Sequence, residues 1–124
     1  MAAAPLRIVV ADDSASYRRT ICSILRRMRK LQIVAEVECG RAAIQAAEQH
    51  RPDVVLIGNR IPFRDCVHAA ATIKTKFPEV RVIILSESSG ISFLREAYKA
   101  GAFWCLKRGC TSRDILRTIR AAET

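Results

Sequence analysis

Two adjacent carboxylates, Asp12 and Asp13, are the residues of this chain whose types and spacing best suit chemistry. They follow Leu6–Ala11, a short apolar run rich in β-branched residues, which predicts a strand. Adjacent carboxylates repel each other unless a hard divalent cation such as Mg²⁺ shares them. Either could instead only cap the following helix, because Asp and Ser are favoured at that position. The pair therefore indicates a metal pocket, present or ancestral, or a helix cap.

A hydroxyl and a cation follow two other apolar runs. Ser86 comes after Val80–Leu85, and Lys107 or Arg108 comes after Ala102–Leu106. Each residue alone is a weak indication, because strand ends often carry such side chains. In an open α/β sheet, however, the crevice beyond the carboxyl ends of the strands is where ligands bind. We therefore expect two acids, a hydroxyl and a base to share one crevice.

The stretch that decides what this crevice can do is 52–62, PDVVLIGNRIP. Its apolar core, Val54–Ile57, is too short for a core helix and predicts a strand buried on both faces of a parallel sheet. The residues at the end of that strand are Gly58 and Asn59. Glycine at the central position of the crevice brings no functional group.

The elements that must position these residues alternate regularly along the chain. Runs of strand length occupy 6–11, 31–37, 53–57, 80–85 and 102–106, and segments with apolar residues at helical spacing lie at 14–28, 40–50, 66–77, 91–98 and 115–122. Pro78 should stop the third helix, and Gly101 should form the C-terminal cap of the fourth. This alternation predicts a three-layer, flavodoxin-like (βα)5 α/β fold with a parallel five-stranded sheet in the order 2-1-3-4-5.

Length and composition narrow the class of protein. A chain of 124 residues fits one domain, 1–124. It has no apolar run near the roughly 20 residues of a membrane span and no charged, apolar leader, so we expect a cytoplasmic protein with no membrane partner. The five cysteines are odd in number and show no CxxC spacing, which favours reduced thiols that fill the core.

The charge balance allows a second class of function. The chain has 21 Lys and Arg against 12 Asp and Glu, a net charge of +9, and such a surface can attract nucleic acid or another polyanion. The candidate surface is a basic outer face of the first helix, made of Arg18, Arg19, Arg26, Arg27, Arg29 and Lys30. Single-strand binders interleave aromatic residues with such cations. Because this stripe lacks them, we expect nucleic-acid binding less than protein binding.

Several segments resemble the receiver domains of bacterial two-component response regulators, and among these the receivers usually joined to a helix-turn-helix DNA-binding domain. The similar segments are VVADDSASYRR, AEVECGRAAIQAAEQHRPDVVLI, RIPFRDCVHA, VIILSES and AGAFWCLKRG, which together span nearly the whole chain. The resemblance implies a role in phosphorelay signal transduction and transcription regulation. It also implies a possible DNA-binding output domain beyond Thr124.

The same resemblance implies residue roles. Members of the family transfer a phosphoryl group to an aspartate four residues before the proline of a turn, and an acidic pair holds the Mg²⁺. Here Asp12 and Asp13 match the acidic pair and Ser86 matches the switch hydroxyl, but the residue four before Pro62 is Gly58. Glycine can neither accept phosphate nor bind a metal through a side chain. We therefore expect an atypical receiver that lacks the phosphoacceptor, is no enzyme, and binds Mg²⁺ weakly or not at all.

The end of the fifth strand also departs from the family. An ungapped count places Arg108 at the position of the family's lysine, and Lys107 fits only with a one-residue deletion. Arg108-Gly109 replaces the usual Lys-Pro step, so no cis-proline is expected. Cys105 falls where many relatives have a switch aromatic, beside Phe103 and Trp104, either of which could take that place. Basic residues should then neutralise the acidic pair in place of metal, with Arg60, Arg64, Lys107 and Arg108 as candidates.

Output should depend on the face that the family uses for dimerisation, formed by the fourth helix, fifth strand and fifth helix. The candidate interface residues on it are Phe93, Tyr98, Trp104, Arg113, Arg117 and Arg120. Aromatic residues with arginines suit a protein interface, so a protein partner or a homodimer is expected. The alternative is that the aromatics are tucked into the core and the arginines are only solvated.

Overall fold

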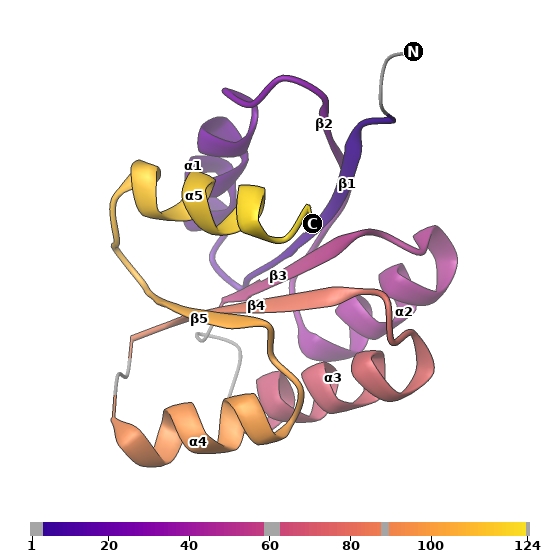
Figure 1. Cartoon of the computed structure of the whole chain (residues 1–124), viewed down its shortest axis with the longest axis vertical. Coiled ribbons are helices and arrows are strands. Elements are labelled where there is room, and N and C mark those ends of the chain that lie inside the picture. Colours follow the sequence, from indigo (N-terminus) through magenta and orange to yellow (C-terminus); the bar gives the residue numbers. More distant parts are fainter. Residues whose placement is uncertain (1–3, 59–62, 88–89, 124) are drawn as a thin grey trace.

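Strands and helices alternate five times along the chain (Figure 1). The computed structural model describes residues 4–58, 63–87 and 90–123. The elements are β1 (Leu6–Ala11), α1 (Ala15–Leu25), β2 (Leu31–Val37), α2 (Gly40–His50), β3 (Val54–Gly58), α3 (Phe63–Lys76), β4 (Arg81–Ser86), α4 (Ile91–Lys99), β5 (Trp104–Lys107) and α5 (Ser112–Ala121).

The strands form one parallel sheet in the order β2-β1-β3-β4-β5. This arrangement is the predicted flavodoxin-like (βα)5 fold, which is therefore confirmed. Since all strands run in the same direction, their carboxyl ends meet at one edge of the sheet. That edge is where the sequence places its polar residues.

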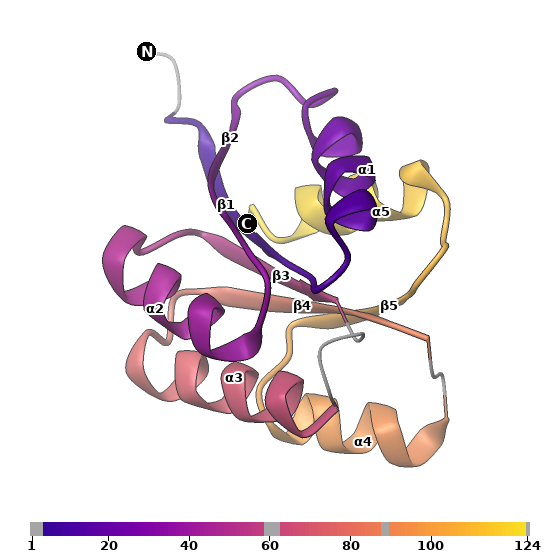
Figure 2. The same cartoon turned by 180° about the vertical axis from the view of Figure 1, so that it is seen from behind.

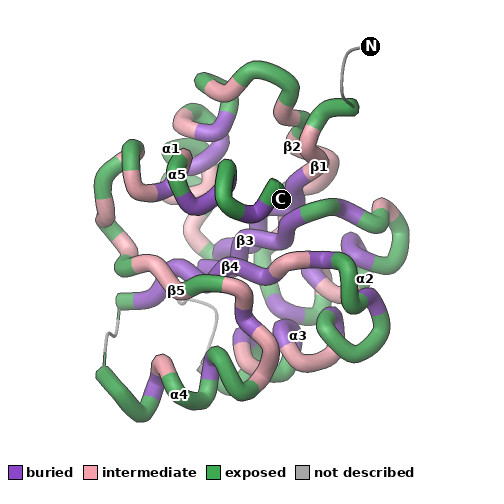
Figure 3. Tube along the Cα trace, viewed as in Figure 1, coloured by how far each residue is buried: buried purple, intermediate pink, exposed green. Residues whose placement is uncertain are grey.

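Two apolar layers hold the helices against the sheet. On one face, Val55, Ile57 and Ile84 pack with residues of α2, α3 and α4; on the other, Leu56 and Ile83 pack with residues of α1 and α5. Figures 1 and 2 show these two helical layers from opposite sides, and Figure 3 shows the buried central strands between them. Successive strand residues alternate between the two layers, because side chains of a strand point to opposite faces. No helix in the described ranges is long and apolar enough to span a membrane.

The first helix ends earlier than predicted. It stops at Leu25, and the backbone then turns through bonds from Arg27 N–H to the Ile24 carbonyl and from Met28 N–H to the Leu25 carbonyl. Lys30 has a φ of 57°, which ends any helical path. Four of the six cations of the expected basic face, Arg26, Arg27, Arg29 and Lys30, therefore lie beyond the helix. The expected stripe along α1 is wrong.

The end of α4 is a glycine-terminated cap. Ala100 is the capping residue. Gly101, which was predicted as the cap itself, follows it with a φ of 105°. The Gly101 N–H bonds to the Tyr98 carbonyl, and the Ala102 N–H bonds to the Ala97 carbonyl. This bond pair is a Schellman motif, which needs a residue with positive φ after the cap. The chain then enters β5 at Trp104, two residues later than expected.

Candidate functional site at the carboxyl ends of the strands

The parallel sheet brings four residues from distant parts of the chain to one crevice. Asp12 follows β1, Gly58 and Ser86 end β3 and β4, and Arg108 follows β5. Asp12 and Ser86 are buried. The Arg108 N–H donates to the Ser86 carbonyl at 2.7 Å, which extends the ladder between β4 and β5 and fixes where the arginine side chain starts.

Asp12 and Arg108 form a buried, two-pronged ion pair. Arg108 Nη1 donates to Asp12 Oδ2 at 2.5 Å, and Nη2 donates to Oδ1 at 3.2 Å. Oδ1 also accepts the Ser14 N–H at 2.8 Å. The side chains of Asp12 and Arg108 are only 3% and 9% exposed. Both carboxylate oxygens therefore already have protein donors, and the geometry is the planar fork that favours arginine over lysine.

Two further side chains, Tyr17 and Glu87, lie against the Arg108 guanidinium. Its carbon lies 3.7 Å from the centre of the Tyr17 ring, and its Nε lies 3.8 Å from a carboxylate oxygen of Glu87. The Tyr17 hydroxyl accepts the Gly109 N–H at 3.3 Å, which ties the loop after β5 to α1. Burial lowers the pKa of Arg108, but the hydrogen bonds and charge of Asp12 outweigh it, so the pKa is raised overall. The cation is permanent at any physiological pH.

Gly58 leaves the space that this pair fills. A Cβ atom added at Gly58 would lie 1.8 Å from Asp12 Oδ2, 2.7 Å from Asp12 Cγ and 3.0 Å from Arg108 Nη1. Real Cβ atoms essentially never approach other atoms under 3.0 Å. A side chain at position 58, aspartate included, would therefore require the Asp12 and Arg108 side chains to move. Close approach of a charged pair to the backbone is a use of glycine that no other residue can serve.

A second arginine supports the backbone of Asp12. Arg18 Nη1 donates to the Asp12 carbonyl at 2.6 Å, and its Nη2 lies 3.8 Å from Glu38. The Arg18 side chain is only 14% exposed, so its expected place on a solvated outer face is wrong. Ser14, not either aspartate, caps α1, because its hydroxyl accepts the Tyr17 N–H. The Asp12 side chain therefore belongs to the crevice, and Ser14 caps α1.

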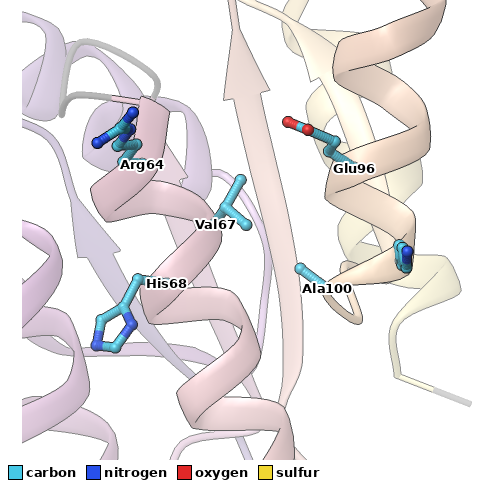
Figure 4. A pocket seen from close by; sticks show the side chains of 6 residues that line it. Arg64, Val67, His68, Glu96 and Ala100 are labelled. Atoms are coloured by element: carbon cyan, nitrogen blue, oxygen red, sulfur yellow. The ribbon is translucent and has the colours of Figure 1, made fainter.

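The remaining expected site residues are exposed or lie outside the described residues. Asp13 and Lys107 are exposed, so Arg108 rather than Lys107 fills the crevice. Arg64 is exposed on α3 and lines a groove with His68 of α3 and Glu96 of α4, among others (Figure 4). Arg60 and Asn59 lie outside the described residues. The described residues contain no cis peptide bond, including the Arg108-Gly109 step.

The donors present do not fit the Mg²⁺ that the family resemblance implies. Hard cations take several oxygen ligands and favour carboxylates. Here the Asp12 carboxylate accepts three N–H donors, Gly58 has no side chain, and the Arg108 guanidinium lies against the same oxygens. Among the described residues, no cluster of three or more His, Cys, Asp or Glu could hold a metal. The crevice balances the charge of Asp12 with a guanidinium.

A buried cysteine contacts the backbone of Gly58. Cys66 Sγ donates to the Gly58 carbonyl at 3.5 Å and is buried. Burial raises the pKa of this thiol to about 12, and the charges of Asp65, Asp12 and Asp13 add to the effect. Such a thiol stays protonated and unreactive near neutral pH. Cys66 therefore fills space below the ion pair.

The expected interface residues separate into exposed and buried ones. Tyr98 and Trp104 are 41% and 51% exposed, and their rings meet edge to face with centroids 6.5 Å apart. The Tyr98 hydroxyl accepts the Cys105 N–H at 3.2 Å, which covers part of the β5 edge. Phe93 is only 9% exposed and packs in the core under α4, so it does not belong to this surface. The three arginines, Arg113, Arg117 and Arg120, are exposed on α5.

Three residues of the crevice were missed as site residues. The sequence pattern indicated no site role for Tyr17 or Glu87, and it placed Arg18 only on the basic face of the first helix. Glu87 follows Ser86 at a strand end, so its position alone could have marked it. For Tyr17 and Arg18 the only indication was their place in the first turn after β1, beside the strand ends.

Comparison with known proteins identifies the family to which this fold belongs. The family model "Response regulator receiver domain" matches residues 8–120. The transcriptional regulatory protein PdtaR of Mycobacterium tuberculosis is 31% identical over 98% of this chain and 58% of its own length, and LnrK of Bacillus subtilis is 25% identical over 96% and 54%. The chain thus spans little more than half the length of these curated relatives.

Solved structures show the same similarity. The signal receiver domain of the response regulator NarL from Mycobacterium tuberculosis superposes with a TM-score of 0.91 at 26% identity, with 98% of each chain covered. The response regulator domain of Thermotoga maritima CheB gives 0.83 at 25% identity, with 95% of this chain and 96% of that one covered. The chain therefore belongs to the response regulator receiver domain family and is a receiver domain of signal transduction.

Proposed function

We propose that this receiver signals through protein–protein contacts without phosphorylation of an aspartate in its crevice. The observation that carries this proposal is the Asp12–Arg108 pair beside Gly58, where a Cβ atom would meet Asp12 Oδ2 at 1.8 Å. The position expected to accept phosphate has no side chain, and the space a side chain would need is filled. The crevice is neither a phosphoryl acceptor nor a Mg²⁺ site.

A built-in arginine makes the charge of the crevice independent of a phosphoryl donor. The guanidinium is always charged, and it ties β1, through Asp12, to the end of β4, through Ser86 and Glu87. These are the strand ends at which phosphorylation would act in a typical receiver. We infer that Arg108 holds them in one arrangement permanently.

The surface left for output is the face of α4, β5 and α5. Tyr98 and Trp104 are exposed there, and aromatic residues with arginines are enriched in protein interfaces. Relatives named transcriptional regulatory proteins are about twice as long as this chain. We therefore propose a protein partner or a second copy at this face, and a DNA-binding output region in the whole protein.

A nucleic-acid function of the α1 cations loses support, because four of the six lie beyond the helix and Arg18 is bound to the Asp12 carbonyl.

The test is a phosphoryl donor with Mg²⁺. Wild-type protein is incubated with acetyl phosphate and Mg²⁺, and its intact mass is measured together with that of the variant Gly58→Asp/Arg108→Lys. We expect no phosphoryl adduct on the wild type and an adduct on the variant, since the lysine frees Asp12 and the new aspartate supplies the acceptor. A stoichiometric adduct on wild-type Asp12 or Asp13 would overturn the proposal.

A further inference from the structure

Two adjoining hollows lie on the outer surface of β5 and α5. The first is lined by apolar side chains of the strand region, Phe103, Trp104 and Leu106, together with Asp114, Arg117, Thr118 and Ala121 of α5. The second is lined by Arg113, Arg117 and Arg120 with Ser112 and Leu116. Arg117 borders both, so an apolar groove continues directly into an arginine-lined one.

The helical repeat explains why the arginines gather. Arg113, Arg117 and Arg120 follow each other at spacings of four and three residues, which places them on one face of α5. Ile115 and Ile119, between them in sequence, are buried against the sheet. All three arginines are exposed, so they stand together on the side of α5 that faces away from the core; Figure 3 shows that exposed and buried stretches alternate along α5.

The charges of this surface disfavour a second copy as its occupant. Between Ile91 and Glu123 the exposed cations are Arg95, Lys99, Lys107, Arg113, Arg117 and Arg120, and the acidic residues are Glu96, Asp114 and Glu123. A two-fold interface sets the same patch against itself. Two surfaces that each carry more exposed cations than acidic residues would then face each other, and like charges placed together across an interface are unfavourable.

We propose that this surface docks an acidic, amphipathic segment of a partner protein, an inference that rests on the proposed output through α4, β5 and α5. An apolar side chain of the segment lies in the groove against Trp104, and its carboxylates pair with the arginines of the neighbouring hollow. Trp and Arg are the residues that most often carry binding energy at protein interfaces. Arginine binds carboxylates through two parallel hydrogen bonds. The apolar groove favours a peptide over a nucleic acid, whose phosphates would use only the arginines.

The probe is a synthetic peptide of about four turns with Leu and Phe on one helical face and Glu and Asp elsewhere. Binding to the whole chain is followed by amide NMR and by calorimetry. Two control peptides keep the length: one replaces the acids by Lys and the other replaces Leu and Phe by Ser. We expect saturable shifts around Trp104 and Arg117 with the acidic amphipathic peptide only.

Variants locate the site. Arg117→Glu should weaken binding by about tenfold or more, since it removes an attraction and adds a repulsion, and Trp104→Ala should weaken it by a similar factor. Arg41→Glu, an exposed arginine on α2, is the matched control and should change affinity less than about twofold. Equal binding of the Lys peptide, or unchanged affinity of Arg117→Glu, would overturn the proposal.

Other occupants give distinct results. Tighter binding of a single-stranded oligonucleotide than of the acidic peptide would assign the arginines to nucleic acid and overturn the proposal. Sedimentation could also show that the chain self-associates and that Trp104→Ala abolishes this. That result would overturn the proposal and assign the surface to a homodimer. Neither result would restore a phosphoacceptor, so the proposed phosphorylation-independent function would stand and is tested separately by the acetyl phosphate experiment.

Discussion

At the scale of single residues, Asp12 and Arg108 are each buried as charged groups and each depends on the other. Asp12 accepts the two Arg108 prongs and the Ser14 N–H, so its charge is fully hydrogen-bonded. Removing one partner of a buried pair leaves the other charge uncompensated, which costs more than the pair contributes. The pair is therefore a strong determinant of local structure whatever its net contribution to stability.

We expect Arg108→Met to lower the free energy of unfolding by about 3–5 kcal/mol, because the Asp12 carboxylate is left buried without its cation. Urea unfolding measures the loss. The double variant Asp12→Asn/Arg108→Met should recover part of it, since no charge then remains buried. Lys107→Met, next to Arg108 but exposed, is the matched control and should change stability by no more than about 0.5 kcal/mol. Equal effects of the two single variants would contradict a buried pair.

The Cys66 thiol gives a pH-dependent prediction. Its pKa is raised from 9.0 to about 12, so unfolded chains release this proton at a lower pH than folded ones. The protonated Cys66 thiol therefore contributes stability to the folded state that is complete below pH 9 and is lost as the pH rises towards 12. Cys66→Ala removes this dependence. The stability difference between wild type and Cys66→Ala should therefore shrink by about 1 kcal/mol from pH 8 to pH 10, measured by urea unfolding at both values. A difference that stays constant would contradict the raised pKa.

At the scale of elements, hydrophobic periodicity predicted most boundaries to within one residue and missed several that local turns set. β2 and α2 begin and end where predicted, because turn residues bracket clear periods. α1 was extended to Met28 because Met28 still packs on the core. Met28 reaches the core through a turn in which hydrogen bonds join residues three apart. Such a turn, like a helix, keeps side chains at that spacing on one side. Hydrophobic periodicity alone cannot distinguish such a turn from a continuing helix.

Two glycines with positive φ, Gly101 after α4 and Gly109 after β5, should not tolerate substitution without a loss of stability. Gly101 has a φ of 105° and Gly109 a φ of 86°, and a Cβ at Gly109 would meet nothing within 4 Å. Gly109→Ala thus isolates backbone strain, which should cost about 1–2 kcal/mol. Gly101→Ala should cost the same strain and slightly more, because its Cβ would meet Lys74 Cγ at 2.7 Å. Thermal unfolding compares them, and a loss for neither variant would contradict the assigned backbone geometry.

The crevice was less predictable than the elements around it. Neighbouring strand residues point to opposite faces, so a one-residue difference in where β5 ends decides between Lys107 and Arg108. The sequence carries no independent marker of that end. The Arg108 N–H bond to the Ser86 carbonyl settles it in the structure. Tyr17 under the guanidinium was equally hidden, because its spacing also fits the helix core.

At the scale of the whole molecule, the receiver fold is kept, and we propose that an ion pair takes the place of phosphoryl chemistry in it. The sheet order and the two helical layers depend on apolar patterning that the sequence states clearly. The crevice depends on one glycine and one arginine, which meet across 50 residues of chain. The fold thus positions the Asp12–Arg108 ion pair in the crevice where the family resemblance implies phosphoryl transfer.

The most direct test of that claim is a titration of the wild-type chain with Mg²⁺ and beryllofluoride, a mimic of the acyl phosphate, followed by two-dimensional amide NMR. We expect no saturable shift at Asp12, Gly58 or Ser86, because the Arg108 guanidinium and the Asp12 carboxylate already occupy the crevice. Saturable shifts at these three amides that spread into α4 would show a working phosphate switch and contradict the proposed function.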